Sequence, residues 1–180
     1  MTMWKSIFLS AGLLTTTLVL PAQAHPNSEA AAKAPFDVQY LDSMTKHHQD
    51  GIMMFEMAVQ KAAMPAVKSK AQMMADMQNK DNADMQRLRA AAGAGPDKAV
   101  NMQMPGMMMM DMSPLKSSSG MAFDHAFIDM TVHHHEGAIK MSKYALARSK
   151  TPGVRAMAQK IIDDSEKDIA DLTRIKASMS

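Results

Sequence analysis

Two pairs of adjacent histidines are the side chains of this sequence best suited to bind a metal ion. His47-His48 and His134-His135 have methionines three, four or seven residues away, spacings that bring side chains to one face of a helix. Imidazole nitrogen and thioether sulfur together suit copper, and thioether sulfur favours the softer Cu(I) over zinc or magnesium. The pattern therefore predicts a copper(I) site that also accepts silver(I), with Cu(II) as the second oxidation state.

The candidate ligands occur in both halves of the chain. A lone histidine or a methionine stripe on an apolar helix face usually belongs to the core, but adjacent histidines that recur favour ligation. His125 and His133 have no histidine at the matching position of the other half, so the pattern does not choose between a ligand and a non-metal role for them. The candidate ligands of the two halves are Met44, His47, His48, Met54, Met73, Met74, Met77, His125, Met130, His133, His134, His135 and Met141.

A third group of sulfur donors lies between the halves. Residues 102–112 contain seven methionines, interrupted by Pro105-Gly106, and cannot form an ordinary core helix. The segment is either an incidental disordered loop or a flexible donor that captures Cu(I) and passes it on. Metal capture is favoured because clustered thioethers in an exported loop are open to oxidation and would need a use. Its candidate ligands are Met104, Met107, Met108, Met109 and Met110.

An internal duplication positions these side chains. Residues 36–90 align with residues 123–177 without a gap and are identical at 19 of 55 positions, both histidine pairs included. Each copy has apolar residues at helical spacing on either side of a proline, the pattern of a helical hairpin. The expected helices span about 36–62, 65–92, 123–150 and 152–177.

Two helical hairpins that cannot each bury their own apolar face predict an all-α protein, a ferritin-like four-helix bundle. No alternating strand pattern is present in the sequence. The first hairpin covers residues 36–92 and the second residues 122–180, and residues 93–121 form a Met-rich crossover loop. Residues 36–180 would make one domain, in which the two histidine pairs face each other across the bundle.

The N-terminal segment predicts export. Residues 1–24 combine Lys5, an uncharged apolar run and an Ala-Gln-Ala end, the pattern of a cleaved signal peptide. A membrane anchor is disfavoured because the run is short for a span of about 20 residues. Residues 25–35 would then form an N-terminal extension, whose His25 could chelate Cu(II) with its new amine, although a residue in this place more often has no role. We expect a periplasmic or secreted protein.

Composition limits the other functions. The 20 basic and 18 acidic residues nearly balance, so neither nucleic acid nor, after signal cleavage, a membrane is an expected partner. No cysteine is present, and the chain has no Glu-x-x-His motif of the di-iron bundles. We therefore expect a metal-binding protein and no enzyme. The alternatives are a redox-active metal-dependent oxidase of the four-helix-bundle type and a Met-rich bundle that binds another protein.

The segments FDVQYLDSMTKHHQDGIMMFEMA and FDHAFIDMTVHHHEGAIKMSKYA resemble the family catalogued as domain of unknown function 305. The resemblance implies a ferritin-like bundle that binds copper and silver in the periplasm or outside the cell, for tolerance or trafficking. It implies one ligand set in Met44, His47 and His48, and a second in His134 and His135. An exported copper transporter or chaperone would be a suitable protein partner.

The second half departs from the family pattern at its sulfur ligand. Thr131 stands where the family has a methionine, and Met130 lies one residue before it. Asp81 and Asp168 are a further repeat-matched pair, and either could form an ion pair with a lysine or arginine, or orient a ligating imidazole.

Overall fold

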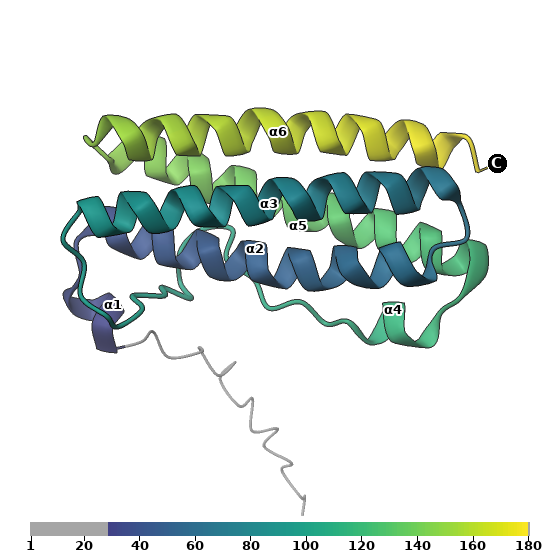
Figure 1. The fold of residues 1–180 in the computed structure, drawn as a ribbon, viewed down its shortest axis with the longest axis horizontal. Coiled ribbons are helices and arrows are strands. Elements are labelled where there is room, and N and C mark those ends of the chain that lie inside the picture. The colour runs from purple at the N-terminus through teal and green to yellow at the C-terminus, as the bar shows by residue number, and fades with distance from the viewer. Residues whose placement is uncertain (1–28, 180) are drawn as a thin grey trace, which may run out of the picture.

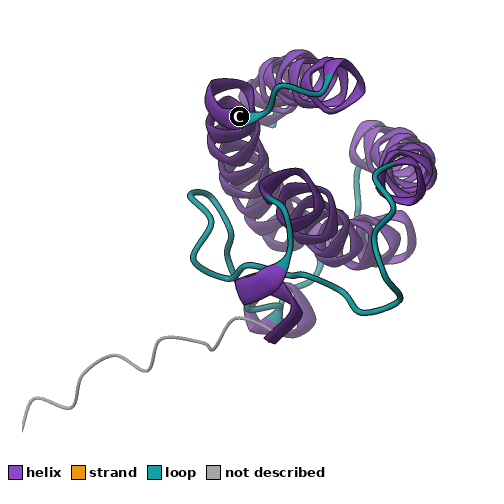
Figure 2. Ribbon diagram, turned by 90° about the vertical axis from the view of Figure 1, so that its left-hand side faces the viewer, coloured by secondary structure: helices purple, strands orange, loops and turns teal. Residues whose placement is uncertain are grey.

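The computed structural model describes residues 29–179, and four long helices dominate it (Figure 1). They are α2 (Phe36–Lys61), α3 (Pro65–Ala91), α5 (Gly120–Arg148) and α6 (Pro152–Ala177). The described elements are helices joined by loops, with no strand in residues 29–179 (Figure 2). The predicted all-α four-helix bundle is confirmed. The predicted signal peptide, residues 1–24, and His25 lie outside the described residues.

The helix ends follow the sequence signals closely. Pro65 and Pro152 occupy the first turn of α3 and α6, where a missing backbone N–H leaves no hydrogen bond unmade. Two short helices were not expected: α1 (Glu29–Lys33) and α4 (Ser113–Ser117). Within α4, Leu115 is fully buried, which ties the end of the crossover to the core. No helix within residues 29–179 is long and apolar enough to span a membrane.

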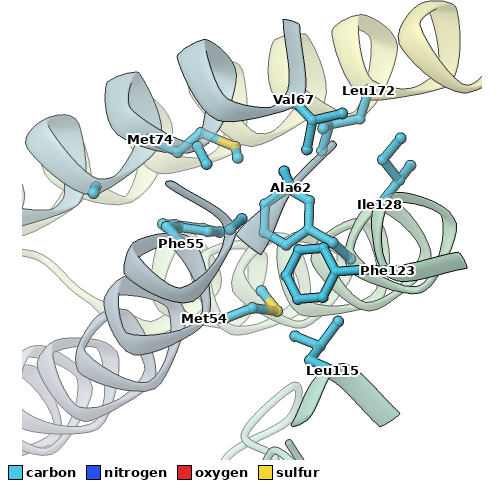
Figure 3. Close-up of a cluster of buried hydrophobic side chains, with 13 residues drawn as sticks. Met54, Phe55, Ala62, Val67, Met74, Leu115, Phe123, Ile128 and Leu172 are labelled. Carbon is cyan, nitrogen blue, oxygen red and sulfur yellow. The ribbon is translucent and has the colours of Figure 1, made fainter. Parts of the chain in front are cut away.

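The two hairpins pack α2 against α5 and α3 against α6, and their side chains form two main apolar clusters. One cluster surrounds Phe55, Phe123 and Leu172 (Figure 3), and the other surrounds Tyr40 and Met141. Along α2 and α5 the buried histidines lie between the residues of the two clusters. The centre of the bundle is therefore polar and lies between two apolar ends.

The repeated Phe-Asp pair has a structural role in each hairpin. Asp124, at the start of α5, accepts hydrogen bonds from the backbone N–H groups of Ala63 (2.9 Å) and Met64 (2.8 Å), in the turn of the first hairpin. Its repeat partner Asp37 accepts a hydrogen bond from Thr151 Oγ1, in the turn of the second hairpin. Each hairpin thus caps the turn of the other, which explains why both copies keep the pair.

The crossover folds against the bundle, along the α2 and α5 side (Figure 1). Asp42 accepts hydrogen bonds from the backbone N–H of Ala99 (2.8 Å) and from Arg89 Nε (2.7 Å), and so fixes the start of the crossover. Met104 is buried in the cluster around Tyr40, whereas Met110 packs on the cluster around Phe55. The Met-rich segment therefore passes the polar centre on its way between the two clusters.

Candidate metal centre

The two histidine pairs meet at the centre of the bundle, as the duplication predicts. All four rings are buried. The rings of His47 and His134 stack with centroids 3.9 Å apart and planes 30° from parallel. His48 lies 6.4 Å from His47, and His135 lies 5.9 Å from His134, between ring centroids. Helices α2 and α5 can approach this closely because position 51 is glycine: a Cβ there would lie 2.6 Å from His134 Cε1.

Most of the imidazole nitrogens have no hydrogen-bond partner among residues 29–179. His134 Nε2 donates to the backbone carbonyl of His47 at 2.9 Å. A carbonyl can only accept, so His134 carries its proton on Nε2 and its lone pair on Nδ1. Buried polar atoms normally find a partner, and a metal ion can serve as one. The buried nitrogens without a hydrogen bond are His47 Nδ1 and Nε2, His48 Nδ1, His134 Nδ1, and His135 Nδ1 and Nε2. Of these, His135 Nε2 has a longer contact of 3.4 Å with Asp168 Oδ2.

Burial keeps the imidazoles of His47, His48 and His134 neutral by lowering their pKa values. It lowers the pKa of His47 and His48 well below the ordinary value, and the neighbouring histidines lower both further. Burial, aided by the nearby His135, lowers the pKa of His134 to about 3. A neutral imidazole offers a lone pair, which is the form that binds a metal ion. The centre is therefore prepared for ligation without a proton having to leave.

A small polar pocket of about 10 Å³ lies on the α3 and α6 side of the histidines. That volume is close to the room one water molecule needs. Its walls include four repeat-matched pairs of positions, 48/135, 77/164, 78/165 and 81/168, so the pocket lies where the two copies of the duplication meet. The lining residues are His48, Met77, Gln78, Asp81, His135, Ile161, Asp164, Ser165 and Asp168.

Both repeat-matched acids of the pocket are held by lysines. Lys160 Nζ lies 2.7 Å from Asp81 Oδ1, and Lys70 Nζ lies 2.6 Å from Asp168 Oδ1. The other oxygen of Asp168 lies 3.4 Å from His135 Nε2. Burial opposes ionisation of Asp168, but His135 and Lys70 outweigh it and lower the pKa of that carboxyl. Asp168 therefore forms the ion pair considered from the sequence and also lies beside His135. That it orients a ligating imidazole stays a prediction.

The predicted sulfur ligands are placed unequally. Met44, Met54, Met74 and Met141 are fully buried in the two apolar clusters, and Met104 joins Met44 and Met141 in one of them. The half-buried members of the set are Met77 at the pocket, Met130, Met107, Met108 and Met110.

Four predicted ligands lie at the surface. Met73 is 55% exposed and Met109 is 65% exposed. His125 and His133 are exposed as well, and His133 Nδ1 lies 3.7 Å from Glu136 Oε2. These side chains do not belong to the central group, and ligation by them stays a prediction.

The crossover brings a thioether next to the histidine centre through a contact between two glycines. A Cβ on Gly137 would lie 2.7 Å from the Gly106 carbonyl oxygen. The same point is 2.8 Å from Met108 Cε and 3.1 Å from His47 Nε2. Sequence reasoning missed Gly51, Gly106 and Gly137. For Gly137 a signal existed, because the matching position of the first repeat is Asp50.

The histidines and carboxylates do not by themselves form a metal cage. Within residues 29–179, no three or more side chains of His, Asp or Glu are grouped so that they could hold one ion. An ion at the centre with more than two protein ligands would therefore have to add thioether sulfur to imidazole nitrogen, the donor set that suits a soft monovalent ion.

Comparison with known proteins agrees with this architecture. The structure of CopM in the Cu(I)-bound form superposes with a TM-score of 0.69 and 25% identity, covering 81% of this chain and 99% of that one. CopM in the Cu(II)-bound form gives a TM-score of 0.70 and 28% identity, covering 80% and 97%. A DUF305 protein from Streptomyces coelicolor gives 0.69 and 21%, covering 79% and 92%, and supports the fold alone. None of the curated proteins matches the sequence.

The family described as "Domain of unknown function (DUF305)" matches residues 21–89 and, in a second alignment, residues 37–176. The longer match spans both histidine pairs, the crossover and the polar pocket. On this evidence the chain belongs to the DUF305 family.

Proposed function

We propose that this protein binds copper(I), and silver(I) as its surrogate, outside the cytoplasm. The observation that carries the proposal is the group of four buried imidazoles, most of whose nitrogens have no hydrogen-bond partner within residues 29–179. Buried methionines lie one to two helical turns away on the same helices. The likeness to CopM, whose structures hold Cu(I), Cu(II) or silver, supports a copper-binding role.

The role we infer is sequestration or trafficking for metal tolerance, without catalysis. The predicted signal peptide supports export, where a soft-metal site made without cysteine escapes thiol oxidation. A metal-dependent oxidase is the alternative. The two buried acids of the pocket are already paired with Lys160 and Lys70, which leaves few carboxylates for a di-iron centre.

An anaerobic Cu(I) competition titration against a chromogenic chelator tests the proposal. The chain without residues 1–24 is compared with a variant carrying Asn at positions 47, 48, 134 and 135, and with a variant lacking residues 102–112. Circular dichroism establishes that each variant is folded. We expect tight binding that weakens in the Asn variant. The copper proposal fails if the unaltered chain never competes with the chelator.

Two further measurements separate the functions. Oxygen-dependent oxidation of Cu(I) or Fe(II) with turnover would favour the oxidase. Stoichiometric binding without turnover, together with copper sensitivity of cells that lack the protein, would favour sequestration or trafficking.

A further inference from the structure

The contact between Gly106 and Gly137 holds the Met-rich crossover against α5, and the crossover is called seated in this arrangement. Gly106 has φ of +94°, a conformation that favours glycine, and a Cβ there would lie 2.1 Å from the carbonyl oxygen of Gly137. A Cβ on Gly137 would in turn lie 2.7 Å from the carbonyl oxygen of Gly106. Neither position accepts a side chain without moving backbone, so both glycines are needed for this approach.

The seated crossover closes over one nitrogen of the histidine centre. His47 is only 1% exposed, and neither of its ring nitrogens has a hydrogen-bond partner among residues 29–179. Its Nε2 and Met108 Cε both lie about 3 Å from the point where a Gly137 side chain would begin, at 3.1 and 2.8 Å. The terminal methyl of the Met108 thioether, one bond from its sulfur, and an imidazole nitrogen without a hydrogen bond thus both border the space that Gly137 leaves open.

The duplication shows that this arrangement belongs to one half only. Asp50 occupies the position that matches Gly137, and both of its carboxylate oxygens lie 2.5 Å from Lys46 Nζ. A carboxylate and a lysine therefore stand on α2 where α5 has open backbone. The crossover can seat on α5 beside His47, whereas the equivalent surface beside His134 is occupied.

We propose that Met108 and His47 Nε2 are ligands of one Cu(I) site that is complete only when the crossover is seated on α5. Met44, which lies one helical turn before His47 and in the same cluster as Met104, is the candidate for a third donor. The crossover then closes one side of the site. When it moves away from α5, the bound ion becomes accessible to a partner protein that carries its own soft ligands. This inference rests on the proposed copper function.

Two substitutions separate the parts of the site. Met108→Leu removes the sulfur at nearly constant volume, and Gly106→Ala unseats the crossover without altering a ligand. Met121→Leu, at a methionine 43% exposed, and Gly95→Ala, where an added Cβ meets nothing within 4 Å, are the matched controls. We expect the Cu(I) dissociation constant to rise about tenfold or more in the first two variants, by analogy with loss of a supporting ligand contact. The controls should match the unaltered chain.

A second readout is the rate of thioether oxidation, measured first without metal and then with Ag(I). In the metal-free protein, dilute hydrogen peroxide oxidises accessible thioethers, and mass spectrometry locates the sulfoxides. Gly106→Ala should speed the oxidation of Met108 and leave that of Met121 unchanged. In the unaltered chain, Ag(I) should slow the oxidation of Met108 but not of Met121.

The outcomes are distinguishable. If the unaltered chain does not bind Cu(I), the proposed function fails. If it binds tightly, but Met108→Leu and Gly106→Ala bind equally well and Ag(I) gives Met108 no protection, the loop-closed site is overturned and the copper function stands.

Discussion

The imidazole of His134 stacks on that of His47 with ring centroids 3.9 Å apart, and its Nε2 donates to the carbonyl oxygen of the same residue at 2.9 Å. Imidazole nitrogens bind metals in the ring plane, and the lone pairs of two stacked rings lie in nearly parallel planes, so the two rings do not hold one ion between their faces. The stacked pair therefore separates the histidine centre into two sides. His47 Nε2 faces the crossover, while His48 and His135 line the pocket toward α3 and α6.

Acid should destabilise the metal-free protein through its buried histidines. The pKa values of His47, His48 and His134 are lowered in the folded state, so between the ordinary value of 6.5 and the folded value (about 3 for His134) the unfolded chain binds more protons. The stability that these groups contribute is present above pH 6.5 and lost as pH falls. Each can contribute up to about 1.4 kcal/mol per pH unit. Urea unfolding at pH 7, 6 and 5 measures the slope.

A matched control isolates this effect. His48→Gln should reduce the pH slope, whereas His125→Gln, at an exposed position, should leave it unchanged. A free energy of unfolding that stays constant from pH 7 to pH 5 would show that the buried histidines do not control acid stability.

Gly51→Ala should destabilise the bundle by forcing the histidine stack apart. An added Cβ would lie 2.6 Å from His134 Cε1 and 2.7 Å from Gln78 Oε1. Overpacking of this kind costs about 1–3 kcal/mol. Gly95→Ala is the control, since its Cβ meets nothing within 4 Å. Chemical denaturation should show a lower midpoint for the first variant only, and equal midpoints would mean that α2 and α5 can move apart without penalty.

Asp124→Ala should destabilise the protein more than Asp37→Ala, although the repeat makes the two residues equivalent. Asp124 is fully buried and satisfies two backbone N–H groups, whereas the contact of Asp37 with Thr151 is exposed. An unsatisfied buried group costs about 1–3 kcal/mol, and an exposed polar contact contributes much less. Thermal unfolding of the two variants gives the comparison, and a larger loss for Asp37→Ala would contradict it.

The repeat register is what made much of this structure predictable. A gapless duplication that carries Pro65 and Pro152 in the same place sets both turns, and with them the antiparallel hairpins and the meeting of the histidine pairs. The sequence did not show which methionines face the core and which face solvent. Met73 and Met74 are adjacent and both suit a soft metal, yet one is 55% exposed and the other fully buried.

The seating of the crossover could not be predicted, because it depends on long-range contacts. Gly106 follows a proline and looks like an ordinary turn residue, and its fit against Gly137 exists only after α5 has packed. The hydrogen bond from Ala99 N–H to Asp42 is equally non-local. In sequence, Asp42 is one of several acids on a helix.

Asp168→Asn should weaken Cu(I) binding by loosening His135. Asp168 Oδ2 lies 3.4 Å from His135 Nε2, and partners of this kind orient a ligating ring, so their loss costs about 10- to 100-fold in metal affinity. Lys70 would keep a partner in this variant, because its Nζ also lies 2.6 Å from Asp171 Oδ2. Competition titration gives the dissociation constant.

Asp171→Asn is the matched control, since it removes the other carboxylate of Lys70 and leaves the contact between Asp168 and His135 in place. If weakened binding comes from the orientation of His135, only Asp168→Asn should show it, and nitrogen NMR should report a changed tautomer balance for His135 in that variant alone. If both variants weaken binding equally, the cause is the charge around Lys70 and not the histidine. That result would show that Asp168 acts only as an ion-pair partner of Lys70 and does not orient His135.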